Sequence, residues 1–244
     1  MSRVLTDDYN HLINKLNNHE PFAFGHFNDG EMQYILNSSK ETISRGDQDH
    51  SKELEEHLRR VFISNNKKFY RGIPCRLCFP KMRIGAIELL TEHVFEKIPV
   101  VDACVFHHNY YSNRGQLFEA IKSYKKITWI TSEKFNLNRV LDLLQIDREK
   151  YHIRHLQMSN TNSYNNYKEY CNIEYETDEL VILLCGPIGR ILAGEGIDKY
   201  PKTTFLCLGS YFDNMSNDAR HGYYYSDELC AGCCPINSSN DKLK

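Results

Sequence analysis

The sequence predicts an α/β fold of the Rossmann-like, doubly wound type, with a mainly parallel sheet and helices on both of its faces. Short runs rich in β-branched, aromatic and aliphatic residues, typical of buried strands, recur at residues 22–27, 100–106, 127–131, 180–185 and 203–208. Segments with apolar residues at helical spacing separate most of these runs. Strands that alternate with helices in this way form parallel sheets.

Each helix is predicted from a stripe of apolar residues. Thr6 is placed to cap an opening helix that carries Tyr9, Leu12, Ile13 and Leu16 on one face. Further helices are marked by Leu54, Leu58, Val61 and Phe62, by Ile84, Ile87, Leu90 and Val94, and by the segments 116–124, 137–144 and 188–193.

The composition is that of one globular domain, predicted to cover residues 1–237, with a flexible tail at 238–244. The formal net charge is −2, and no long basic run is present, which argues against a general nucleic-acid binder. No window has the length or hydrophobicity of a membrane span or of a secretory signal. We therefore expect a soluble, cytoplasmic protein that can still associate peripherally with a membrane, and its oligomeric state stays open.

Two carboxylates, Asp29 and Glu31, follow the first predicted strand and are separated by Gly30. In an extended segment, residues two apart point to the same side, so the pair is predicted to hold Mg²⁺ or Mn²⁺ together with substrate phosphates. The alternative is an ordinary turn followed by a helix start, where acidic residues are also favourable.

Other polar residues are predicted to gather at the same edge of the sheet, because the carboxyl ends of parallel strands lie together. Gly186 and Pro187 begin a helix whose N-terminus suits phosphate, and Arg190 adds a positive charge; a simple tight turn is the alternative. One of His107 and His108 is expected to face the crevice. The residues assigned to nucleotide-sugar binding are Asn28, Gly30, His107, Ser132, Gly186, Pro187, Gly189, Arg190, Gly209, Ser210 and Asp213.

Nine cysteines without a secretory signal make a complete disulfide framework unexpected. Cys75 with Cys78 and Cys230 with Cys233 form two Cys-x-x-Cys pairs that suit a structural tetrahedral Zn²⁺ site, and Cys234 is an alternative ligand. The alternative is that these cysteines are reduced thiols.

Three motifs occur in the order seen in GT-D-type glycosyltransferases, which the chain resembles over most of its length. They are Phe27-Asn-Asp-Gly-Glu31, Leu184-Cys-Gly-Pro-Ile-Gly-Arg-Ile-Leu-Ala193 and Leu208-Gly-Ser-Tyr-Phe-Asp213. One departure is His26-Phe-Asn28, where the family pattern has Arg-Phe-Gly. The resemblance implies a metal-dependent enzyme that transfers a hexosyl or pentosyl group from a nucleoside diphosphate sugar, most often a UDP-sugar, to a hydroxyl of a glycan or glycoprotein. Asp29 and Glu31 would be its catalytic residues, and one of them could instead act as a general base.

Two other functions were weighed. A non-catalytic protein of the same fold that binds nucleotides or glycans is the main alternative. A Rossmann methyltransferase is disfavoured, because a glycine-rich first loop is missing and carboxylates stand in its place.

Overall fold

The computed structural model describes residues 3–36, 51–76, 79–94, 97–108, 110–159 and 161–216. Its elements, in chain order, are α1 (Arg3–Asn17), β1 (Ala23–His26), α2 (Asp29–Leu36), α3 (Lys52–Phe62), β2 (Phe69–Ile73), α4 (Pro80–His93), β3 (Val100–Asp102), α5 (Val105–His108), α6 (Tyr110–Ser123), β4 (Lys126–Ser132), α7 (Leu137–Leu144), β5 (His152–Met158), the 3₁₀ helix η1 (Ser163–Asn166), α8 (Tyr167–Tyr170), β6 (Glu179–Leu184), α9 (Pro187–Lys199), β7 (Thr204–Cys207) and α10 (Asp213–Ser216). The predicted tail at 238–244 lies outside the described residues.

The strands form one sheet in the order β3-β2-β1-β7-β6-β4-β5, and every pair of neighbours is parallel. The register places the ends of the central strands level with one another, since Gly25 of β1 pairs with Cys207 of β7, which pairs with Leu183 of β6. The carboxyl ends of β1, β6 and β7 therefore form one edge.

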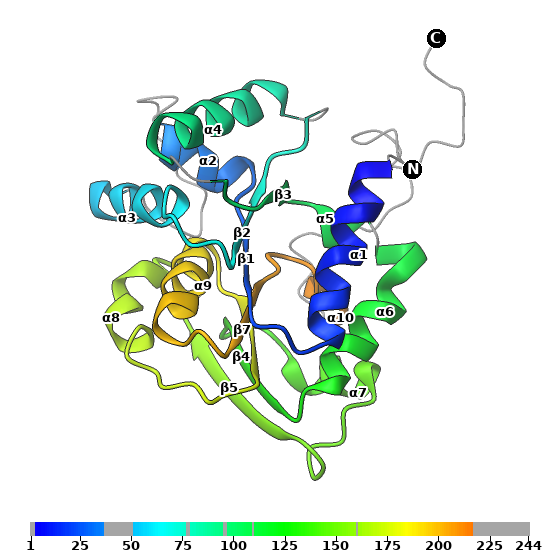
Figure 1. Cartoon of the computed structure of the whole chain (residues 1–244). Coiled ribbons are helices and arrows are strands. Elements are labelled where there is room, and N and C mark those ends of the chain that lie inside the picture. The colour runs from blue at the N-terminus through cyan, green and yellow to red at the C-terminus, as the bar shows by residue number, and fades with distance from the viewer. Residues whose placement is uncertain are drawn as a thin grey trace.

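Two apolar layers cover the sheet, one on each face. In Figure 1, α1, α6 and α7 lie on one side of the strands, and α3, α8 and α9 lie on the other. The first layer is built around residues such as Leu12, Leu117 and Leu141, and the second around residues such as Leu58, Ile191 and Phe205. The α/β doubly wound architecture predicted from the sequence is confirmed.

Strand β3 is shorter than predicted. The segment 100–106 was expected to be a single strand, but β3 ends at Asp102 and α5 begins at Val105. The side chain of Asp102 accepts a hydrogen bond from the backbone N–H of Cys104 at 2.9 Å. An aspartate that bonds to the backbone two residues further on forms a turn, which ends the strand.

Two strands, β2 and β5, have no counterpart in the prediction, and one helix buries a different face. Strand β2 carries a buried arginine, Arg71, and β5 is a half-exposed edge strand in which four of the seven residues are polar. In α4 the expected stripe is wrong at Ile84 and Ile87, which are 56% and 46% exposed, and right at Leu90, which is buried. The helix packs against α2 and buries Ala86 and Leu89 together with Leu90.

The sheet has a topological switch point between β1 and β7. The chain leaves β1 toward α2, whose Met32 and Ile35 belong to the layer around Leu58. It leaves β7 toward α10, whose Met215 belongs to the opposite layer. Loops that diverge from neighbouring strands leave a crevice between them, and ligands of open α/β sheets bind in such crevices.

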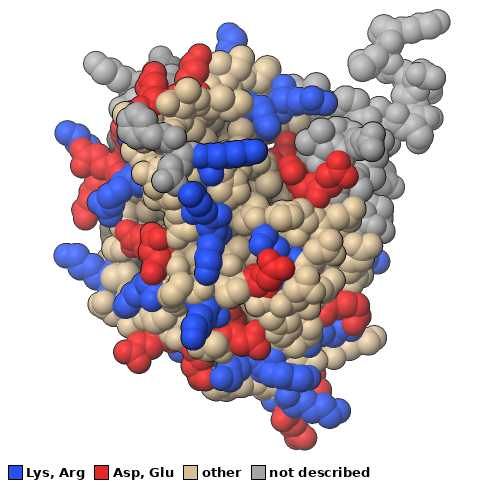
Figure 2. Space-filling view, in the orientation of Figure 1, with Lys and Arg blue, Asp and Glu red and all other residues tan. Residues whose placement is uncertain are grey.

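Among the described residues, none of the helices is long and apolar enough to cross a membrane. Figure 2 shows acidic and basic side chains interspersed over the face that it presents. The surface seen there has the mixed charge that the sequence composition indicates.

Candidate functional site

The start of α2 forms one wall of the crevice. Asn28 is the N-cap residue, because its carbonyl accepts the first helical hydrogen bond, from Met32 N at 3.0 Å. Glu31 Oε2 accepts a bond from the backbone N–H of Asn28 at 3.3 Å, as in a capping box. The expectation that Asp29 and Glu31 point to the same side of an extended segment is wrong. Both lie in the first turn of the helix, where residues two apart are separated by roughly 200°.

Arg190, the fourth residue of α9, joins this wall to the loop after β6. Its side chain is 4% exposed, and it donates hydrogen bonds to the carbonyl of His26 at 2.7 Å and to the carbonyl of Gly186 at 2.5 Å. Its Nη2 lies 3.3 Å from Glu31 Oε1. Burial opposes the charge of Arg190, but negative groups around it, which include Glu31 and Asp29, outweigh this effect and raise its pKa.

His26, the last residue of β1, is buried beside this wall and was not among the predicted site residues. Arg190 Nη2 is 3.1 Å from His26 Nδ1, and because a guanidinium group can only donate, the neutral ring carries its hydrogen on Nε2. The ring of His107 lies 5.2 Å from that of His26, and Tyr211 lies 5.6 Å from His107. The sequence signals for His26 were its position at the end of the first predicted strand and its place in His26-Phe-Asn28, where the family pattern has Arg-Phe-Gly.

The glycines of the predicted site have different structural roles. Gly186 has φ 62° and ψ −149°, a combination that essentially only glycine adopts, so it sets the sharp entry into α9 before Pro187. Gly209 has φ +59°, and a Cβ there would lie 3.0 Å from His26 Nδ1. Gly189 lets α9 approach the sheet, because a Cβ at this position would lie 3.0 Å from Cys207 Sγ. Gly30 is buried in the first turn of α2.

The remaining predicted residues lie along the same edge but further apart. Ser210 follows β7, and Asp213 is buried at the start of α10. Ser132 ends β4, which is separated from β7 by β6, so its backbone lies about 10 Å from that strand. The structure thus brings Asn28, Glu31, Arg190, Gly209 and His107 around His26, and it leaves Ser132 at a distance.

Asp29 and Asn28 are the residues at this edge that would hold a hard cation, and phosphate oxygens would complete its coordination. Asp29 is half-buried, and the Oδ1 atom of Asn28 is buried without a hydrogen-bond partner in the described part of the chain. Within that part, no group of three or more His, Cys, Asp or Glu residues is arranged to hold a metal ion. Mg²⁺ and Mn²⁺ are commonly bound by one or two carboxylates plus substrate phosphates, which is the arrangement that this donor set offers.

The proposed zinc ligands fall mostly outside the described residues. Cys75 is buried after β2, whereas Cys78, Cys230 and Cys233 are not described, so the zinc site stays a prediction. Cys185 and Cys207 lie beneath α9, where burial raises the pKa of both thiols. Protonated thiols in such a position are unreactive and act as small apolar groups.

Asp102, at the end of β3, is a buried carboxylate that sequence reasoning did not single out. Burial raises its pKa to about 6, against the opposing effects of the Cys104 N–H and of Arg83, whose Nη1 is 3.8 Å away. Cys75 and Asp8 also face it and raise the pKa further. Asp102 is therefore protonated in the folded protein at pH values where an ordinary aspartate is ionised.

Replacing Asp102 with asparagine is expected to stabilise the protein at neutral pH relative to acid pH. The unfolded-state pKa is about 3.8, so wild-type stability falls as the pH rises from about 4 to 6, and above 6 the cost of the buried charge is fully present. About two pKa units correspond to about 3 kcal/mol. We expect the variant to gain about 1–3 kcal/mol over wild type between pH 4 and pH 7.5, as measured by urea unfolding. The same gain for the surface variant Asp142→Asn, or a flat difference for Asp102→Asn, would contradict this.

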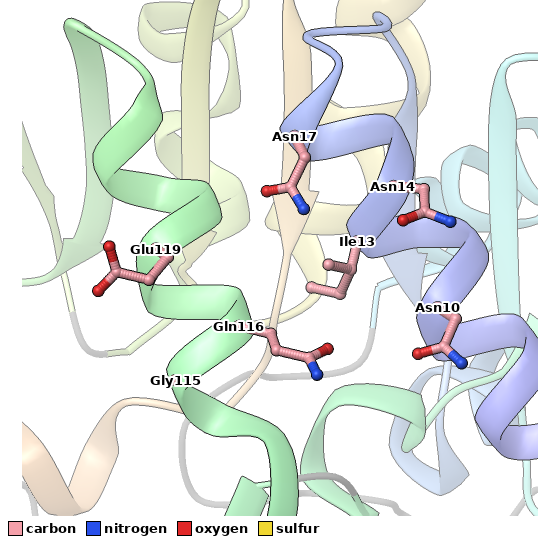
Figure 3. Close-up of a pocket in the computed structure, with 7 residues that line it drawn as sticks. All are labelled: Asn10, Ile13, Asn14, Asn17, Gly115, Gln116 and Glu119. Atoms are coloured by element: carbon pink, nitrogen blue, oxygen red, sulfur yellow. The ribbon is translucent and has the colours of Figure 1, made fainter.

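A hollow in the described surface lies elsewhere, between α1 and α6. It has a volume of about 800 Å³ and is lined by Asn10, Ile13, Asn14, Asn17, Gly115, Gln116 and Glu119 (Figure 3). Ile13 lies at its base, and the other lining residues are exposed. No basic side chain lines this groove, so the edge at the ends of β1 and β7, where Arg190 lies, is the better candidate site for a negatively charged ligand.

The fold resembles those of solved structures, at low sequence identity. No protein-family model matches the sequence, and no curated protein matches it. A structure described as a new glycosyltransferase (DUF1792) from Streptococcus sanguinis superposes with a TM-score of 0.59 at 15% identity, covering 83% of this chain and 80% of that one. Another, described as the highly conserved domain of unknown function 1792 with a distinct glycosyltransferase fold, has a TM-score of 0.58 at 16% identity and covers 86% and 78%.

These similarities confirm the fold that the sequence motifs predicted. The chain has the Rossmann-like glycosyltransferase fold of the DUF1792 structures. At this level of identity the likeness concerns the fold, and the reaction has to be argued from the site.

Proposed function

We propose that the protein is a metal-dependent glycosyltransferase that moves a sugar from a nucleoside diphosphate sugar, with UDP as the favoured nucleotide, to a hydroxyl of a glycan or glycoprotein. One observation carries the proposal: Asp29, at the start of α2 after β1, and the N-terminus of α9, after β6, lie at the same edge of the sheet beside the β1/β7 switch point, and Arg190 of α9 donates to the carbonyl of His26 at the end of β1. This arrangement places a hard-cation ligand and a phosphate-binding helix end beside one crevice.

The chain supplies binding, orientation and charge compensation. The first backbone N–H groups of α9 and its dipole favour a diphosphate, and Asp29 with Asn28 Oδ1 would hold Mg²⁺ or Mn²⁺ beside it. Such a cation stabilises the negative charge that develops on the departing diphosphate. His107, whose ring lies 5.2 Å from that of His26, would contact the acceptor. The donor assay described below identifies whether the transferred group is a hexosyl or a pentosyl group.

The proposal is tested by incubating the protein with a panel of nucleoside diphosphate sugars, with and without Mn²⁺, and measuring release of the nucleoside diphosphate. We expect release that requires the metal and that is selective for one nucleotide. Binding of a nucleotide without turnover, with or without added acceptors, would instead favour a non-catalytic binding protein of the same fold. Absence of both binding and turnover would contradict the proposal.

A further inference from the structure

The groove between α1 and α6 is lined by amide side chains that the rest of the protein does not use. Asn10, Asn14 and Asn17 share one face of α1 at helical spacing, and Gln116 of α6 lines the opposite side. Within the part of the chain that the structure describes, no hydrogen bond involves these amide groups. Asparagine is among the weaker helix formers, and these positions are exposed, so neither helix stability nor core packing explains the three asparagines.

The space between the two helices is large enough for a ligand. Its volume of about 800 Å³ falls within the range of roughly 300–1,000 Å³ that is usual for ligand sites. A Cβ atom at Gly115 would meet no other atom within 4 Å. Ile13 closes the base and is 4% exposed, so the groove has an apolar floor and polar walls. In Figure 3, Gln116 points toward α1, whereas Glu119 points away from the gap.

The lining of the groove is close to electrically neutral. Glu119 is the one charged residue among the described residues that line it, and its Oε1 atom pairs with Lys122 Nζ. Phosphate groups and nucleic acids are bound chiefly by arginine and lysine, which the lining does not supply. The groove therefore fits an uncharged polar ligand.

Amide groups match the hydroxyl groups of a sugar. Each amide offers two N–H donors and an acceptor oxygen, and each sugar hydroxyl can both donate and accept a hydrogen bond. An extended peptide fits less well, because peptide grooves provide apolar pockets for alternate side chains. Ile13, at the floor, is the single apolar side chain that lines the described groove. An oligosaccharide is the ligand class that this lining favours.

One end of the groove lies next to the helix that carries His107. Tyr9, which precedes Asn10, packs against Phe106 of α5 with ring centroids 6.0 Å apart. Phe106 in turn packs against Phe24 of β1 at 5.1 Å. His107 follows Phe106 in α5. The groove therefore begins beside the residue that would contact the acceptor and continues along α1 and α6.

We infer that the groove between α1 and α6 binds the acceptor as an extended, uncharged oligosaccharide. The reacting sugar lies at His107, and the sugars that follow it lie along Asn10, Asn14 and Gln116 toward Asn17. The role of the groove as an acceptor site rests on the proposed function. Its preference for an uncharged oligosaccharide rests on the lining alone.

The first test is saturation-transfer NMR with oligosaccharides of glucose, galactose, mannose and N-acetylglucosamine. Oligogalacturonate serves as the charged counterpart and tri-alanine as a peptide probe. We expect wild type to bind an uncharged oligosaccharide more tightly than either of these two probes. Equal binding of oligogalacturonate, binding of tri-alanine alone, or binding of none of the probes would overturn the inference.

Gly115→Trp tests whether the oligosaccharide lies in the groove. The indole would fill the open space at Gly115, so we expect binding to weaken more than about tenfold. The midpoint of urea unfolding should not fall, because glycine is a poorer helix former than tryptophan. Leu143→Trp, at a position of α7 that is 53% exposed, is the matched control and should bind like wild type. Unchanged binding by Gly115→Trp would place the oligosaccharide elsewhere and overturn the inference.

Asn14→Ala separates ligand binding from helix stability. Alanine is the stronger helix former, so the midpoint of urea unfolding should rise slightly. The loss of hydrogen bonds to the sugar should weaken oligosaccharide binding about 3- to 10-fold. A purely structural role for Asn14 would leave binding as tight as in wild type, and that result would contradict the placement of the sugars along α1.

The transfer assay separates this inference from the proposed function. When the bound oligosaccharide is supplied as acceptor, Gly115→Trp should raise its KM more than about tenfold and change kcat less than about threefold. If wild type turns over no nucleoside diphosphate sugar but binds the oligosaccharide, the proposed function fails and the groove remains a glycan-binding site. If wild type transfers the sugar and Gly115→Trp leaves KM unchanged, the acceptor role of the groove fails alone.

Discussion

Replacing Asp29 with asparagine is expected to reduce metal-dependent sugar transfer about 100- to 1,000-fold while the protein stays folded. Asparagine retains the shape of aspartate but removes the negative charge that would hold Mg²⁺ or Mn²⁺ beside the diphosphate. Asp29 is half-buried in the first turn of α2, so the change costs little in packing. Release of nucleoside diphosphate at saturating donor, followed at several Mn²⁺ concentrations, measures the effect.

The matched control for this variant is Glu53→Gln. Glu53 is also an acidic residue in the first turn of a helix, α3, and it is exposed. Removing its charge weakens the same favourable interaction with a helix dipole, by about 0.3–1 kcal/mol at most. We therefore expect normal turnover from the control. Turnover that survives Asp29→Asn would show that the acidic motif is only a turn and that the reacting groups lie elsewhere.

The elements that the sequence predicted correctly are those whose burial follows from composition alone. Residues 180–185 and 205–208 are continuous apolar runs because β6 and β7 are covered on both faces, and parallel strands in that position need no polar alternation. The stripe Leu54, Leu58, Val61 and Phe62 identified α3 for the related reason that one helix face packs on the core. Such patterns depend on local order and burial, which the sequence carries directly.

The parts of the site that escaped prediction depend on contacts across the fold. The ion pair between Glu31 and Arg190 joins residues that are 159 positions apart, and neither residue type indicates the other. The relative directions of the Asp29 and Glu31 side chains depend on whether these residues belong to the end of the strand or to the start of the helix. That boundary differs by only a few residues, yet it changes the directions of the two side chains completely. The edge of the sheet where they lie was nevertheless predicted.

Arg71 explains why β2 was not predicted, and it marks the largest expected loss of stability. It is the middle residue of the strand and is fully buried. Nε donates to the Phe62 carbonyl at 2.7 Å, Nη1 donates to the Phe69 carbonyl at 2.6 Å, and Nη2 donates to Ser64 Oγ at 2.8 Å. A charged residue within a short apolar run indicates a loop in the sequence. Here, however, Arg71 donates hydrogen bonds to backbone carbonyl groups at the end of α3 and next to the turn before β2.

Arg71→Met is therefore expected to destabilise the protein by about 4 kcal/mol or more. Methionine fills much of the same space but donates no hydrogen bond, so the Phe62 and Phe69 carbonyls lose a charged donor while they are still buried. Burial also lowers the pKa of Arg71 to about 10, so the site already bears the cost of a buried cation, and removing that cost offsets part of the loss. Urea unfolding at pH 7 measures the balance.

Arg139→Met, on the exposed face of α7, removes a surface arginine and should change stability by less than about 0.5 kcal/mol. A loss below about 1.5 kcal/mol for Arg71→Met would mean that water or a shifted loop replaces the donors of Arg71, and that the α3–β2 turn does not depend on its guanidinium.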